Sequence, residues 1–361
     1  MKFVVFGLTV SSTWGNGHAT LWRGLCKALA RAGHSVVFFE RDVPYYSDTR
    51  DCVDIPRGKL VLYRDWDDVR SEARAELRDV DVAMITSYCA DGIAAGDLVL
   101  EAPATRVFYD LDTPVTLARL TQGESLPYIG PRGLADFDLV LSFTGGGALD
   151  ALRDRLGARH VAPLYGHVDP DVHRPVPPQP HYRADLSYMG TYSADRQSAV
   201  ERLLIEPARQ RPHARFLIGG AQYPQDFPWT NNIYFVRHLP PVEHPAFFCS
   251  SRLTLNVTRS AMAEMGWCPS GRLFEAAACS APVLSDVWEG LETFFTPGEE
   301  ILAAATAEDA LAAVDLSDAE LSRIGRAARE RTLDQHTSEH RARELIATLE
   351  QAGRPAEVME A

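Results

Sequence analysis

Short apolar runs alternate with amphipathic stretches through the first half of the chain. Apolar residues occupy consecutive positions in these runs, without the strict alternation of a strand that has one solvated face. The pattern therefore predicts parallel strands covered by helices on both sides, as in a doubly wound α/β sheet. We expect these strands at 2–10, 35–40, 60–64, 81–87, 106–110, 138–143 and 160–164.

A helix is predicted at 19–32, because three leucines recur there at intervals of four residues and three basic residues fall on another face. Gly33 follows it as a stop signal. The second half repeats the α/β pattern and ends in a helix near 337–351. We expect its strands at 186–190, 214–220, 232–236, 252–257 and 281–285.

Between the halves, residues 166–183 carry five prolines and no periodicity, which is typical of a linker. A chain of 361 residues also suits two domains better than one. We expect a first domain at 1–168, a linker at 169–183 and a second domain at 184–334.

The composition is that of a soluble globular protein, with 46% hydrophobic and 24% charged residues. The net charge of −13 argues against a nucleic-acid partner, and no apolar run approaches the ~20 residues that span a bilayer. Without a polybasic stretch, a soluble acceptor is favoured over a lipid-linked one. The six cysteines show no metal-ligand spacing, so we expect buried thiols, a reducing cytoplasm and no metal site.

A nucleotide site is indicated near residue 270. Ser270 reads as the N-cap of a helix that starts at Gly271 and carries Arg272, so backbone N–H groups and a guanidinium would converge on an anion. Glu275 lies one turn further along, where a carboxylate can accept hydrogen bonds from a ribose diol. Small residues continue this helix to Pro282, which we expect to end it before the next strand.

FEAAACSAPVLSD at 274–286 and the segment 287–304 resemble the C-terminal signature of nucleotide-sugar glycosyltransferases of the GT-B fold. The segments 15–40, 105–120 and 166–176 extend the resemblance over nearly the whole chain, and it is strongest to the spore-maturation CgeB-type group. It implies two Rossmann-like domains with parallel sheets facing across a cleft, and a C-terminal helix, 335–361, that returns to the first domain. It also implies metal-independent transfer of a sugar from a nucleotide-diphosphate donor to an acceptor nucleophile, with no cofactor.

For the first half, the resemblance places the loop with Gly17 and His18 at the cleft, facing donor and acceptor. Gly17 would contact the donor, and His18 would act as a base or position the acceptor. Asp110 and Asp112 end a predicted strand, at the edge where α/β sheets place ligands. We interpret both as cleft carboxylates without metal, with Asp112 assisting His18. The alternatives are helix capping by an aspartate and a polar helix-start role for His18.

For the second half, the resemblance assigns the donor diphosphate to the turn at Gly190 and Thr191 and to basic residues. Backbone groups around His238 would read the nucleobase. The phosphate candidates are three arginines, each of which could instead form a surface ion pair: Arg196, Arg259 and Arg272.

One departure from the resembled family concerns a pair of glutamates that its retaining members often carry. Glu275 matches the second of them, but Trp267 stands where the first would be, so the anomeric outcome stays open. A non-hydrolysing nucleotide-sugar epimerase of the same fold and a non-catalytic nucleotide-sugar-binding protein are the alternatives. The sugar, the base, the acceptor and the oligomeric state are not specified by the sequence.

Overall fold

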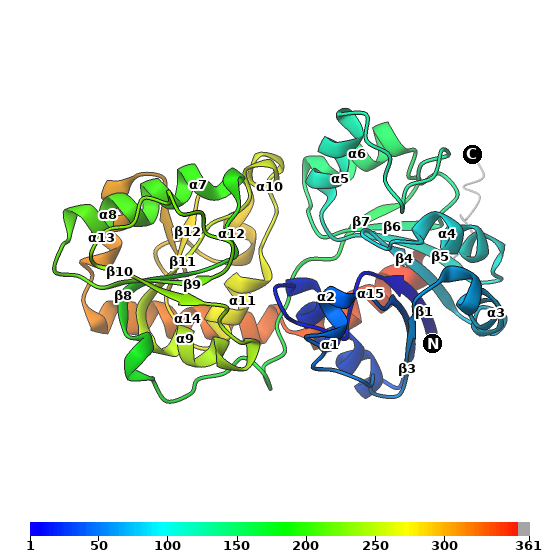
Figure 1. The fold of residues 1–361 in the computed structure, drawn as a ribbon, viewed down its shortest axis with the longest axis horizontal. Helices are drawn as coiled ribbons and strands as arrows, with labels where there is room; N and C mark the ends of the chain where they lie inside the picture. Colours follow the sequence, from blue (N-terminus) through cyan, green and yellow to red (C-terminus); the bar gives the residue numbers. More distant parts are fainter. Residues whose placement is uncertain (353–361) are drawn as a thin grey trace, which may run out of the picture. The chain divides into compact units, whose positions relative to one another are not determined.

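A computed structural model describes residues 1–352, which form two compact units (Figure 1). The first unit contains Met1–Tyr165 and the chain from Ser338 onward, and the second contains Gly166–Thr337. Each unit is built on its own parallel sheet. The expected α/β architecture is confirmed, with one sheet of seven strands and one of six.

The sheet of the first unit has the order β3-β2-β1-β4-β5-β6-β7, with all neighbours parallel. Four consecutive apolar residues of β1, Phe3 to Phe6, are all buried, because helices cover both faces of the sheet. The strands are β1 (Lys2–Gly7), β2 (Ser35–Arg41), β3 (Lys59–Tyr63), β4 (Val82–Thr86), β5 (Thr105–Asp110), β6 (Leu139–Ser142) and β7 (Val161–Pro163).

The C-terminal helix belongs to the first unit although the preceding 172 residues, Gly166–Thr337, form the second. It packs against α1, and Arg31 of α1 forms an ion pair of 2.7 Å with Glu339. The helices of this unit are α1 (Gly17–Arg31), α2 (Pro44–Ser47), α3 (Trp66–Glu76), α4 (Gly92–Glu101), α5 (Thr113–Thr121), α6 (Gly147–Leu156) and α15 (Ser338–Ala352).

The sheet of the second unit has the order β10-β9-β8-β11-β12-β13 and is also parallel throughout. Its strands are β8 (Ala184–Met189), β9 (Phe216–Gly220), β10 (Ile233–Arg237), β11 (Ser251–Asn256), β12 (Val283–Asp286) and β13 (Leu302–Ala304). Its helices are α7 (Ala194–Val200), the π-helical turn η2 (Glu201–Ile205), α8 (Glu206–Gln210), α9 (His244–Ser250), α10 (Ser260–Met265), α11 (Gly271–Ala278), α12 (Leu291–Phe294), α13 (Ala307–Val314) and α14 (Asp318–Gln335), with 3₁₀ turns η1 (Pro180–Tyr182) and η3 (Pro241–Glu243).

The units divide at 165/166 and 337/338, beside the boundaries of 168 and 335 that we expected from the sequence. The proline-rich segment packs within the second unit: the Val176 N–H donates to Cys249 Sγ at 3.4 Å and the Gln179 N–H to Ser250 Oγ at 2.8 Å. Of the C-terminal segment 335–361, residues 353–361 lie outside the described part of the chain.

Three local expectations need correction. The helix carrying Glu275 ends at Ala278 rather than beside Pro282, because Ser280 adopts a left-handed backbone with φ of 58°. The first strand ends at Gly7 rather than at residue 10, because the following residues form hydrogen bonds to a side chain of β2. Strand β13 was not expected; it has only three residues.

None of the helices within residues 1–352 combines the length and the apolar character needed to cross a membrane.

Candidate functional site

In both sheets the strand order reverses direction at one place, and parallel α/β sheets bind ligands at the carboxyl ends of the strands there. In the first unit this place lies between β1 and β4. The loop after β1 leads into α1, whose N-cap Asn16 accepts a hydrogen bond of 3.0 Å from the His18 N–H. The turn after β4 carries Tyr88, so the topology brings His18 and Tyr88 to the same edge of the sheet.

Tyr88 connects His18 with Asp112. The centroids of the His18 and Tyr88 rings lie 5.8 Å apart, and the Tyr88 hydroxyl donates to Asp112 Oδ2 at 2.8 Å. Tyr88 has a φ of 66°, a left-handed conformation that is unusual for a bulky residue. Sequence reasoning missed Tyr88. Burial raises the pKa of the Tyr88 hydroxyl, and the negative charge of Asp112 raises it further. The hydroxyl is therefore a hydrogen-bond donor at neutral pH.

Asp110 has a different environment from Asp112. Its carboxylate is fully buried and accepts hydrogen bonds of 3.1 Å from the Asp112 N–H and from Thr116 Oγ1. Burial raises the pKa of Asp110 to about 6. The Asp110 carboxylate thereby orders the turn that carries Asp112, and its role as a cleft carboxylate stays a prediction.

A buried glutamate of β2 holds the loop after β1, and the sequence analysis did not single it out. Glu40 is fully buried and accepts hydrogen bonds from the Thr9 hydroxyl at 2.7 Å, the Val10 N–H at 2.7 Å and the Ser11 N–H at 2.9 Å, and one from the Ser11 hydroxyl. A carboxylate closing an otherwise apolar strand, SVVFFE, is the sequence signal that could have indicated it. Glu40 thereby fixes the backbone that leads to His18.

In the second unit the strand order reverses between β8 and β11. Gly190 and Thr191 follow β8, as expected from the sequence. The Gly190 N–H donates to the Gly219 carbonyl at 2.9 Å, and the Gly190 carbonyl accepts from the Tyr223 hydroxyl at 3.1 Å. A Cβ on Gly220 would lie 2.0 Å from the Gly190 carbonyl oxygen, so glycine at 220 is what allows the two chain segments to approach.

The three candidate arginines lie in this part of the second unit but differ in their partners. Arg259 forms an ion pair of 3.0 Å with Asp195, which engages its charge. Arg196 on α7 and Arg272 on α11 form no ion pair within residues 1–352, and each has a buried Nε without a hydrogen-bond partner there. Burial lowers the pKa of Arg272, and the positive charge of Arg196 adds to this lowering. Guanidinium groups that have no ion-pair partner are available to bind an anion.

Helix α11 begins beside these arginines. Ser270 is at its N-cap position, as expected, but the Ser270 hydroxyl donates to Asn256 Oδ1 at 2.9 Å instead of capping the helix. The Leu273 N–H donates to the Ser270 carbonyl at 3.1 Å, whereas the N–H groups of Gly271 and Arg272 have no acceptor within residues 1–352 and are left for another one. Glu275 lies one turn further along, half-buried.

Two histidines that the sequence analysis did not predict accompany Glu275. One ring nitrogen of His173, one of His244 and a carboxylate oxygen of Glu275 lie within 4.8 Å of one another. Burial lowers the pKa of His244 to about 4. These residues are about 100 and 30 positions from Glu275 in the sequence, so no local motif could have joined them.

His238 follows β10, as expected for a loop at the edge of the sheet. Its side chain is exposed, its φ is 52° and its N–H donates to the Gly220 carbonyl at 2.8 Å. The backbone around His238 is therefore held against the end of β9, on the same side as the Gly190 turn.

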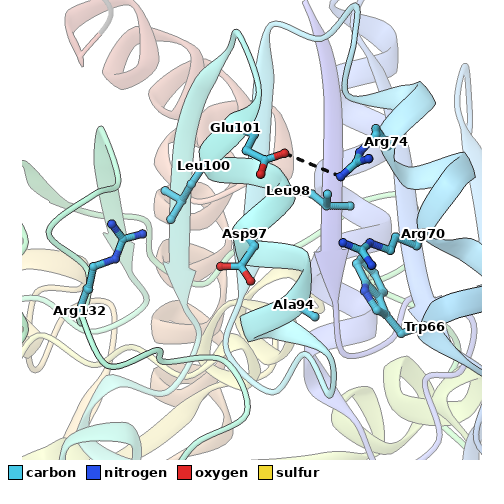
Figure 2. A pocket seen from close by; sticks show the side chains of 9 residues that line it. All are labelled: Trp66, Arg70, Arg74, Ala94, Asp97, Leu98, Leu100, Glu101 and Arg132. Carbon is cyan, nitrogen blue, oxygen red and sulfur yellow. Dashed lines mark ion pairs between the residues drawn. The ribbon is translucent and has the colours of Figure 1, made fainter.

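A separate pocket of 550 Å³ lies on the first unit (Figure 2). Arg74 and Glu101 form an ion pair of 3.9 Å across it, and both side chains are more than half exposed. None of the residues predicted from the sequence lines it. Its lining residues are Trp66, Arg70, Arg74, Ala94, Asp97, Leu98, Leu100, Glu101 and Arg132.

Comparison with known proteins relates this site to a class of enzymes. Residues 196–347, which include Arg196, His238, Arg259 and the segment 270–275, match the family described as "Glycosyl transferase-like". No curated protein matches the sequence.

Solved structures match over almost the entire chain. Sucrose-phosphate synthase from Thermosynechococcus elongatus matches with a TM-score of 0.68 and 14% identity, covering 97% of this chain and 99% of the synthase chain. Anabaena HepE in complex with UDP and glucose matches with a TM-score of 0.68 and 12% identity over 97% of this chain and 100% of its own. A glycosyltransferase from Rickettsia africae has a TM-score of 0.67 and 12% identity over 98% and 99% of the two chains.

The fold is therefore that of GT-B glycosyltransferases. The family match over residues 196–347 supports the assignment of this protein to the glycosyltransferase type.

Proposed function

We propose that this protein is a glycosyltransferase that moves a sugar from a nucleoside diphosphate donor to a hydroxyl or similar nucleophile of a soluble acceptor. The observation that carries the proposal is the pair Arg196 and Arg272, two half-buried guanidinium groups without ion-pair partners within residues 1–352. They lie in a GT-B fold, beside the start of α11, where the chain matches a glycosyltransferase-like family.

The second unit would bind the donor. The diphosphate would be held by Arg196, Arg272 and the N–H groups that begin α11 at Gly271, with the Gly190–Thr191 turn beside it. Because leaving-group charge is compensated by guanidinium groups and a helix N-terminus, this step needs no metal ion. The ribose diol would be bound by Glu275, and the backbone near His238 would face the base.

The first unit would supply the acceptor chemistry. A neutral imidazole is a competent base near pH 7, so we assign proton removal from the acceptor to His18. Asp112 would orient His18 and Tyr88 would orient Asp112, through the hydroxyl that donates to Oδ2. If the enzyme retains configuration, the departing diphosphate takes the proton and His18 positions the substrate.

Within GT-B enzymes we propose a relationship to the CgeB-type group, which rests on the sequence segments that resemble it. We also propose the cytoplasm as the location, in keeping with six free cysteines, four of them buried.

The proposal is tested with a panel of nucleoside diphosphates and their sugars, measured by thermal shift and by calorimetry. One nucleotide should bind in the presence of a chelator, and Glu275→Ala should weaken it by about 1.5–3 kcal/mol, the range for hydrogen bonds to a charged group. Glu264→Ala is the matched control, because Glu264 is an exposed glutamate of α10. This variant should bind the nucleotide as the wild type does. Absence of binding across the panel would refute the proposed function, and equal affinity in Glu275→Ala would refute the ribose assignment.

A further inference from the structure

Three side chains from separate segments of the second unit converge beside α11. His173 comes from the proline-rich segment, His244 is the first residue of α9, and Glu275 lies in α11. One potential ligand atom from each lies within 4.8 Å of the other two, and the histidine ring centroids are 6.4 Å apart. The group is thus assembled by the tertiary structure of one unit alone.

His173 is only 2% exposed, yet neither of its ring nitrogens has a hydrogen-bond partner within the described chain. A buried donor or acceptor without a partner destabilises the fold, so such groups are uncommon without a ligand. No hydrogen bond joins His173, His244 and Glu275 to one another within residues 1–352. The three polar groups therefore surround a common point without satisfying one another.

We propose that His173, His244 and Glu275 bind a divalent transition-metal ion of the zinc type, leaving one coordination position open. Imidazole nitrogen and carboxylate oxygen bind Zn²⁺ at about 2.0–2.2 Å, which places tetrahedral ligand atoms roughly 3.4 Å apart. The 4.8 Å limit on the observed separations requires only small side-chain rotations to reach this geometry. Two imidazole ligands disfavour Mg²⁺ and Ca²⁺, which prefer oxygen.

This ion differs from one that would bridge a donor diphosphate, since the arginines already provide for that charge. It would link the proline-rich segment to α9 and α11 and so stabilise that part of the second unit. Metal binding itself does not depend on the proposed function. Only its coupling to the nucleotide does, because Glu275 would serve both, and metal and nucleotide would then change each other's affinity by the same factor.

The test uses the full chain after treatment with a chelator, in the absence of nucleotide. Calorimetry with Zn²⁺ should give one equivalent bound, and Co²⁺ should give the visible absorption of a four-coordinate site without the near-ultraviolet band of thiolate ligands. Excess Mg²⁺ should not compete. His173→Gln and His244→Gln should each weaken binding by at least about 100-fold, more than loss of a supporting residue usually does.

His213→Gln is the matched control, because His213 is an exposed histidine of the same unit, and it should bind metal as the wild type does. Circular dichroism establishes that each variant is folded. Because His244 is only half-buried, its substitution should disturb the fold less than substitution of the buried His173. Absence of stoichiometric binding by the wild type, unchanged affinity in folded His244→Gln, or a thiolate band would each overturn the assignment. Failure of nucleotide binding in chelator would instead count against the proposed function alone.

Discussion

The substitution Arg272→Gln tests whether Arg272 binds a ligand or stabilises the fold. Glutamine keeps much of the side-chain length and polarity but removes the positive charge. In a structural ion pair this would leave a carboxylate without its partner and lower the free energy of unfolding. Arg272 has no carboxylate within ion-pair distance in residues 1–352. Its pKa is lowered on balance, by burial first and then by the charge of Arg196, although the charge of Glu275 acts in the opposite direction. We therefore expect the free energy of unfolding without ligand to stay the same or to rise.

Nucleotide affinity should change in the opposite direction. Hydrogen bonds to charged groups contribute about 1.5–3 kcal/mol, which corresponds to a rise in Kd of roughly 10- to 150-fold. At a nucleotide concentration of 100 times the wild-type Kd, the ligand stabilises the wild type by about 2.7 kcal/mol. For a variant with a tenfold higher Kd the same concentration stabilises by only about 1.4 kcal/mol.

Urea unfolding with and without the best-binding nucleoside diphosphate measures both quantities on one sample. Arg211→Gln is the control, because Arg211 belongs to the same unit and forms an ion pair of 2.5 Å with Asp315. Its nucleotide affinity should match the wild type. Arg272→Gln with reduced stability and unchanged nucleotide affinity would refute the reasoning, since that result is the signature of a structural residue.

Four further substitutions test other residues. His18→Ala and Asp112→Asn should lower turnover by about 10²–10⁴ with donor affinity intact, as measured by initial rates and calorimetry; near-native turnover in both would exclude base catalysis. Glu40→Gln should lower the free energy of unfolding by about 1–3 kcal/mol in urea titrations, because an amide group cannot accept all the hydrogen bonds of the buried carboxylate; an unchanged midpoint would contradict this. Burial raises the pKa of Asp286 to about 6, so its contribution to stability is lost as the pH rises from about 4 through 6. The stability of the wild type minus that of Asp286→Asn should decrease over this range, and a constant difference would show that Asp286 does not titrate there.

Much of the fold follows from local pattern. Consecutive apolar residues in short runs require burial on both faces, and this requirement alone predicted the strands of both parallel sheets, except for β13. Strand ends were less accurate, because they depend on partners from elsewhere in the chain. The strand at residue 2 stops at Gly7 because Glu40, on another strand, takes the hydrogen bonds of the next residues.

The candidate site, like the fold, was predicted from the sequence only in part. The sequence by itself predicted an anion-binding segment from Ser270 to Glu275, because a helix start, an arginine and a carboxylate are adjacent there. Only the tertiary structure decided that Arg259 is paired with Asp195 while Arg272 is not, since ion pairing depends on distance in space. For the same reason only the fold could bring His173 to Glu275, across a sequence separation that no periodicity encodes.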